Sequence, residues 1–139
     1  MSDLKNILNA LVDTFSSQFP LREVDRNYED IHSEHELNLE AGVFSFVFKR
    51  ERDYVDHLHQ RASDATQEVL CIARQLLEEN ATGIDAEDAE ITMIEQMKSF
   101  VRSNNLPTEI QSIKLISSQG SAQTELPLAW VIFELEIIE

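Results

Sequence analysis

The stretch that decides the fold is VFSFVFK, residues 43–49. Its three phenylalanines, Phe44, Phe46 and Phe48, alternate with small, aliphatic or charged residues, so their rings share one face of a predicted β-strand. Three aromatic side chains on one strand face favour a place in the core. If the strand lies at a sheet edge, the same rings would instead form an oligomer contact. The charged residues that follow, from Lys49 to Asp53, end the strand.

This strand belongs to a longer region, residues 21–52, that looks extended. Leu37 and Leu39 alternate with polar residues, which predicts a strand with one wet face. Ala41-Gly42 interrupts this run and allows a tight connection or a bulge before the strand from Val43 begins.

Three helices are predicted around these strands. The first covers Leu4 to Phe19, because apolar residues recur at three- and four-residue spacing until Pro20 ends the helix. A longer helix is predicted over residues 54–80, and another over residues 86–104. The seam of the second helix is Leu58, Ala62, Ala65, Val69, Ile72 and Leu76, and the stripe of the third is Ile91, Ile94, Met97 and Val101.

The C-terminal third returns to strand patterns at residues 110–117 and 128–138. The whole chain, residues 1–139, is therefore expected to be one domain of the α+β class. Its sheet would be antiparallel or mixed, with the N-terminal helix and two consecutive helices packed on it and a β-hairpin at the C-terminal end.

The composition is strongly acidic, with 26 Asp and Glu against 11 Lys and Arg and a net charge of −15. Such a charge disfavours ordinary nucleic-acid binding, which depends on Lys and Arg at the phosphates. Solubility is the simplest interpretation, and a surface that repels DNA or meets a basic partner is the functional one. No secretory signal and no apolar run long enough to span a bilayer are visible, so we expect a cytosolic protein without membrane association.

The search for catalytic chemistry finds no motif. The three glycines are isolated, so no phosphate-binding loop is present, and the single cysteine, Cys71, is expected to be a buried, inert thiol. His32 with His35, and His57 with His59, lie among acidic residues and could be drawn as zinc ligands. Solvated side chains are the favoured interpretation of both pairs. We therefore expect no catalytic residue, no metal and no cofactor, and a protein that is not an enzyme.

The order and length of these elements resemble those of the tail terminator and tail-completion proteins of long-tailed bacteriophages, the minor tail protein U-like proteins. The resemblance covers nearly the whole chain and involves no shared motif. The matching segments are Leu4–Phe19, Val43–Lys49, Tyr54–Asn80, Ala86–Asn104, and the pair Ile110–Ser117 with Leu128–Ile138.

The resemblance implies a virion protein that is assembled in the host cytoplasm. Tail terminators form a hexameric ring that caps the tail tube protein and gives the head connector a docking surface, while DNA passes through without specific binding. An acidic lumen would then repel the phosphates of DNA. Apolar contacts and local ion pairs would hold the ring, and the candidate interface residues are Phe44, Phe46, Phe48, Lys49, Arg50 and Arg52.

Two other functions stay open. An intracellular binding or adaptor module would use an acidic face, around Asp85–Glu90, to dock a basic protein partner. A metal-dependent hydrolase would use the histidine pairs. Of the three, the ring-forming tail protein is the leading hypothesis.

Overall fold

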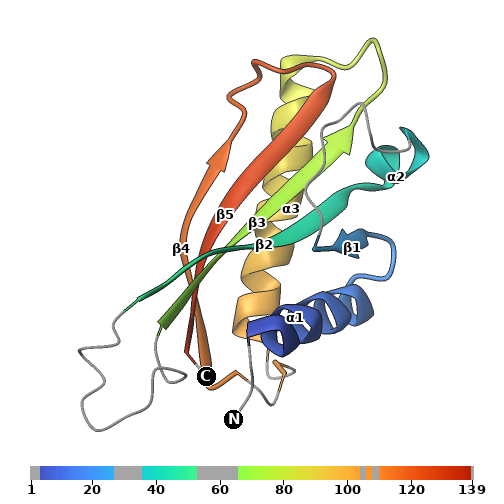
Figure 1. Cartoon of the computed structure of the whole chain (residues 1–139). Helices are drawn as coiled ribbons and strands as arrows, with labels where there is room; N and C mark the ends of the chain where they lie inside the picture. The colour runs from blue at the N-terminus through green and yellow to red at the C-terminus, as the bar shows by residue number, and fades with distance from the viewer. Residues whose placement is uncertain (1–3, 27–35, 53–65, 104–105, 108–109, 139) are drawn as a thin grey trace, which may run out of the picture.

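The computed structural model describes residues 4–26, 36–52, 66–103, 106–107 and 110–138. These residues form a mixed five-stranded sheet with strand order β1-β2-β3-β5-β4, and helices pack on it (Figure 1). In chain order the elements are α1 (Leu4–Gln18), β1 (Glu23–Asp25), α2 (Glu36–Ala41), β2 (Val43–Arg52), β3 (Thr66–Leu76), α3 (Gly83–Arg102), β4 (Ser112–Gly120) and β5 (Leu128–Ile138). The expected α+β class and the C-terminal strand pair are confirmed.

Only the short first strand breaks the antiparallel order of the sheet. β1 runs parallel to β2, and all the other neighbours are antiparallel. β3 lies in the middle, paired with β2 on one side and along its whole length with β5 on the other. Two register shifts, between Phe48 and Arg50 and between Leu115 and Ser117, mark β-bulges in β2 and β4.

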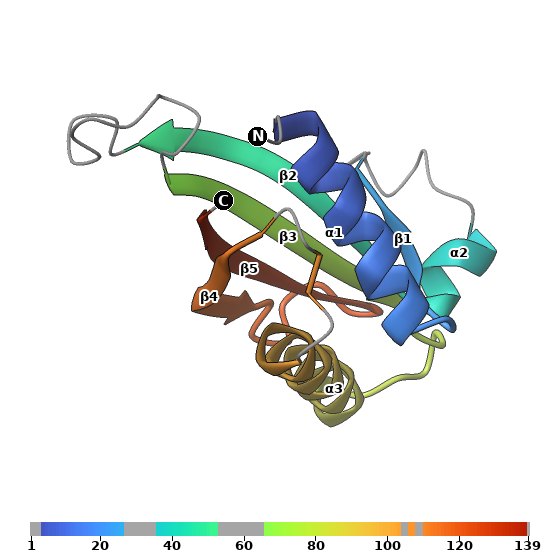
Figure 2. The same cartoon turned by 90° about the horizontal axis from the view of Figure 1, so that it is seen from below.

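Both long helices pack on the same face of the sheet. α1 lies over the β1–β2 half and α3 over the β4–β5 half, as Figure 2 shows from below. Phe15 of α1 joins the two halves, because its ring centroid lies 4.7 Å from that of Phe44 and 5.0 Å from that of Phe100 on α3. Alternate residues of the strands complete this core, among them Phe46, Val69, Cys71, Ala73, Val131, Phe133, Leu135 and Ile137.

α3 begins with a capping box at Thr82. The Thr82 hydroxyl accepts a hydrogen bond from the Asp85 amide, and the Asp85 carboxylate accepts one from the Thr82 amide. These two bonds satisfy orphan donors at the helix start, and the negative charge of Asp85 suits the positive end of the helix dipole. The helix therefore starts three residues before the predicted Ala86 and ends at Arg102.

The helix predicted over residues 54–80 is wrong for the part that the structure describes. Thr66–Leu76 is the strand β3; residues 53–65, which include Leu58, Ala62 and Ala65, lie outside the described residues. Because β3 is a central strand, it carries apolar residues on both faces. Val69, Ile72 and Leu76 then fit a helical spacing by coincidence, while Val69, Cys71 and Ala73 alternate into the core. In the described residues 66–103, a strand and one helix therefore stand where two consecutive helices were expected.

The strand expected around Leu37 and Leu39 is also wrong. Glu36–Ala41 forms the short helix α2, and the Leu39 side chain is buried. Gly42 ends this helix with a φ of +90°, and its amide donates a hydrogen bond to the Leu39 carbonyl. A two-leucine alternation is too short to distinguish one helical turn from a strand, so tertiary packing decides.

Candidate interaction surface

The sheet face opposite α1 and α3 carries a cluster of charged side chains at one end. We call these residues the charged cluster: Lys49, Arg50 and Arg52 on β2, Glu68 on β3, and Glu134 and Glu136 on β5. The strand register aligns them, because Arg50 lies opposite Glu68 and Glu68 lies opposite Glu136. Side chains in register on one face of neighbouring strands lie within contact distance. The cluster thus joins three strands that are far apart in sequence.

The bulge in β2 brings consecutive cations to the same acids. In a regular strand Lys49 and Arg50 would point to opposite faces. The register shift between Phe48 and Arg50 adds a residue at Lys49, and the Lys49 ammonium then lies 2.6 Å from Glu134 and 3.7 Å from Glu68. The bulge therefore lets a basic run of sequence pair with acids on one face only.

Glu68 is the centre of the charged cluster. Its side chain is only 7% exposed, and its Oε2 accepts hydrogen bonds from Nε of both Arg50 and Arg52, the latter at 2.7 Å. Arg52 extends the network, since its Nη2 lies 2.7 Å from a carboxylate oxygen of Glu136. A carboxylate this enclosed needs such partners, because burying an unpaired charge is costly.

The pKa values of the cluster follow from these contacts. Burial acts to raise the pKa of Glu68, but the hydrogen bonds from Arg50 and Arg52 outweigh it and hold that pKa below its usual value. The hydrogen bond from Lys49 lowers the pKa of Glu134, and the same bond raises the pKa of Lys49. All three groups thus stay charged over a wider pH range than they would alone.

The predicted interface residues divide between the core and this surface. Phe44 and Phe46 are fully buried under α1, whereas Phe48 is 43% exposed. Phe48 lies opposite the core residue Val69 and so belongs to the helix face of β2, whereas the cations at positions 49, 50 and 52 lie on the other face. The structure brings these cations together with acids that sequence reasoning did not connect to them. Glu134 and Glu136 lie in the predicted last strand, residues 128–138, whereas Glu68 lies in a segment predicted to be helical.

Apolar side chains continue the same sheet face beyond the charged cluster. Val47 lies opposite Leu70, and Ile72 lies opposite Ile132, and these side chains are all partly exposed. Trp130 follows on β5 and is also partly exposed. Alternate residues on the other face contact α1 and α3, so neither of these helices covers this apolar strip.

The far end of the molecule is purely acidic. We call residues 77–88 and 121–127 the acidic end, since they include Glu78, Glu79, Asp85, Glu87, Asp88 and Glu125 and no Lys or Arg. Gln123 ties the two segments together, because its side-chain amide donates a 2.9 Å hydrogen bond to Glu87. Glu90, which the adaptor hypothesis placed on this face, is instead buried and accepts hydrogen bonds from the amide and hydroxyl of Ser121.

The described residues offer little that could do chemistry. They contain no group of three His, Cys, Asp or Glu side chains placed to hold a metal, and both histidine pairs fall outside them. Cys71 is fully buried, as expected, and burial raises the pKa of its thiol well above the ordinary value, which keeps the thiol protonated and inert.

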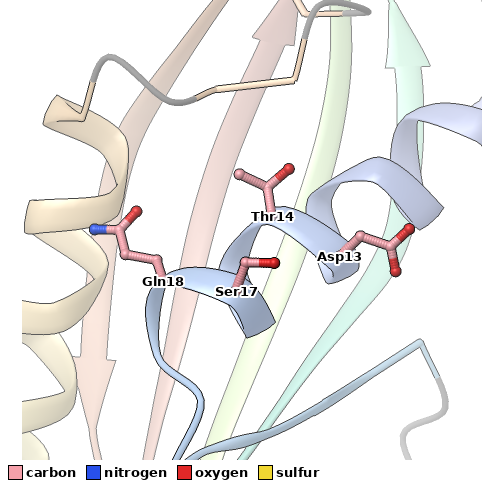
Figure 3. A pocket seen from close by; sticks show the side chains of 4 residues that line it. All are labelled: Asp13, Thr14, Ser17 and Gln18. Atoms are coloured by element: carbon pink, nitrogen blue, oxygen red, sulfur yellow. The ribbon is translucent and has the colours of Figure 1, made fainter.

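A hollow of about 390 Å³ lies against α1, lined by Asp13, Thr14, Ser17 and Gln18 (Figure 3). In Figure 3 Gln18 extends toward α3, away from the Asp13 carboxylate. No basic group within the four lining residues activates the Thr14 or Ser17 hydroxyl, which a nucleophile would require. The hollow is a surface depression between four polar residues of one helix.

These features define a class: a small α+β domain with its two long helices on one face of a mixed sheet and a cluster of paired charges on the other. No family model matches the chain, and the search of curated proteins finds no similar sequence. Among the described residues, no helix is both long enough and apolar enough to cross a membrane.

Proposed function

We propose that the chain is a ring-forming structural protein of a phage tail, which caps the tail tube and joins it to the head connector. The layout supports this proposal at all but one of the matched segments. The N-terminal helix, the strand from Val43, α3 and the C-terminal strand pair keep the order and approximate lengths of a tail terminator. The exception is β3, which occupies part of the segment expected to be the first of two helices.

The observation that carries the proposal is the distribution of charge. Lys49, Arg50 and Arg52 are the densest run of cations in the chain, and each is paired with an acid of its own sheet. Within the residues that the structure describes, no Lys or Arg pairs with the acidic end, so this end presents a surface of negative potential. In a ring, those acids of this surface that lie outside the contacts between copies would face the lumen, repel DNA phosphates and let DNA pass without binding.

Light scattering coupled to size-exclusion chromatography tests the proposal, with the chain alone and with the tail tube protein. We expect a closed oligomer of the 15.9 kDa chain, or a monomer that assembles on the tube. A stable monomer without affinity for any tube protein would contradict the proposal.

The acidic end favours a second candidate, an adaptor that docks a basic protein. Such a complex would be sensitive to salt, because exposed charges are screened over about 8 Å at physiological ionic strength. Glu79→Lys with Asp88→Lys would then abolish the capture of one dominant basic partner from the native host. If capture shows no basic partner, the adaptor hypothesis is wrong; Glu90 is unsuitable for this test because its carboxylate is structural.

A further inference from the structure

A basic groove lies between the C-terminal end of α3 and the edge strand β4. It has a volume of about 600 Å³ and is lined by Lys98, Val101, Arg102, Lys114, Leu115 and Ile116. Three cations and three apolar residues thus line one groove of a chain whose net charge is −15. This concentration of positive charge contrasts with the acidic net charge of the chain.

The cations of the basic groove differ from those of the charged cluster. Within the described part of the chain, Arg102 and Lys114 have no ion-pair partner, and Lys98 pairs only with exposed Glu95 one turn earlier, at 3.4 Å. Ile116 beside them is 51% exposed. An apolar floor with unpaired cations at its rim suits a partner surface that is apolar at its centre and acidic around it.

The acidic end of the same chain has that composition. Ile84 is 68% exposed at the start of α3, with Asp88 one turn further along the helix and Glu79 in the loop before it. Leu126 is also exposed and lies beside Glu125. The acidic end therefore offers exposed apolar side chains surrounded by carboxylates, which complements the basic groove in both charge and polarity.

One molecule cannot bring these two surfaces together. They lie at opposite ends of α3, whose 20 residues span about 30 Å. Figure 1 shows the start of α3 beside the β4–β5 connection and its last turn near α1, at the other end of the sheet. The complementary surfaces can meet only between two copies.

We propose that the acidic end of one copy docks into the basic groove of the next, with Ile84 against the apolar floor and the acids at positions 79 and 88 facing Arg102 and Lys114. This contact joins two different surfaces, so it closes into a ring if the rotation between copies allows. The inference deepens the proposed ring-forming function, on which it rests, by naming its two interface surfaces. The long-range repulsion between acidic copies is screened beyond about 8 Å at physiological salt, whereas ion pairs that become partly buried in the contact are screened much less.

Paired charge reversals test this contact, read by sedimentation velocity of the full chain at about 0.15 M salt. Wild type is expected to self-associate. Arg102→Glu with Lys114→Glu, and separately Glu79→Lys with Asp88→Lys, should each raise the dissociation constant about tenfold or more, because like charges then face each other. All four changes in one chain should restore association at the wild-type net charge. The control, Lys5→Glu with Arg26→Glu on the α1–β1 side, changes the net charge as much as the groove variant and should leave association unchanged.

The outcomes separate this inference from the proposed function. If both charge-reversal variants associate as tightly as wild type, the head-to-tail contact is wrong. A ring held by other surfaces then remains open. Equal weakening by the control, or no recovery in the fourfold variant, also overturns it, because net charge or misfolding then explains the loss. A wild type that is monomeric in solution but binds tail tubes contradicts this contact and not the tail function.

Discussion

The two faces of the sheet differ in the interactions that their side chains make. On the helix side, aromatic rings from α1, β2 and α3 form a dry core around Phe15. On the other side, six charged groups pair across β2, β3 and β5 at a partly exposed surface. Burial of apolar area drives folding, whereas exposed ion pairs contribute little to it. The first face should therefore determine stability, and the second should determine what the surface can contact.

The largest loss of stability is expected at Phe46, and Phe48 on the same strand serves as its comparison. Phe46→Ala should lower the free energy of unfolding by about 3–5 kcal/mol, because it removes a fully buried ring and leaves a cavity. Phe48→Ala, two residues away on the same face but 43% exposed, is the matched comparison and should cost about 1 kcal/mol or less. Urea denaturation followed by circular dichroism measures both, and equal losses would contradict the division into core and surface.

The sequence predicts the elements with strong periodicity and misses a central strand. The strand from Val43, the helix from Leu4 and the last strand, Leu128–Ile138, have strong periodicity and were predicted within a few residues. β3 was missed because a central strand is apolar on both faces and lacks the alternation that identifies a strand. The alternation of Phe44, Phe46 and Phe48 predicts a shared face, but only the packing of α1 decides which rings it covers.

The candidate surface was predictable to a similar extent. Lys49, Arg50 and Arg52 are adjacent in sequence, so they could be recognised as a cluster. Glu68 could not be assigned to them, because that contact depends on the non-local pairing of β2 with β3. The basic groove likewise joins residues of α3 and β4 whose proximity only the fold establishes.

A buried carboxylate provides the next test. Glu90→Ala should lower the free energy of unfolding by about 1–3 kcal/mol, because the amide and hydroxyl of Ser121 would lose their acceptor in a buried site. Asp88→Ala, on the same helix and exposed, is the control and should change stability by less than about 0.5 kcal/mol. Thermal unfolding measures both; a Glu90 variant as stable as the control would show that this contact does not hold α3 to the β4–β5 connection.

The smallest stability effect is expected at Glu68, and it should depend on pH. The pKa values of Glu68 and Glu134 are lower in the folded protein than in the unfolded chain. Their contribution to the free energy of unfolding is therefore fully present above the unfolded-state pKa of about 4.3. It is lost as the pH falls through their folded-state pKa values. The pKa of Lys49 is raised in the folded protein. Its contribution to the free energy of unfolding is therefore present below about pH 10.4 and is lost as the pH rises through its folded-state pKa.

Glu68→Gln should therefore be less stable than wild type near neutral pH, with a difference that shrinks below about pH 4. Urea denaturation at a series of pH values measures it, with Glu125→Gln as the exposed control. A difference that stays constant through the acid range would mean that Glu68 does not stabilise the fold through its charge.

The proposed function requires this chain to assemble as a ring at the end of a tail tube. The most direct measurement is electron microscopy of tube protein polymerising with and without the chain. The account predicts tubes whose growth stops at a ring-shaped cap when the chain is present. Tubes of unchanged length with bare ends, at a molar excess of the chain, would contradict it.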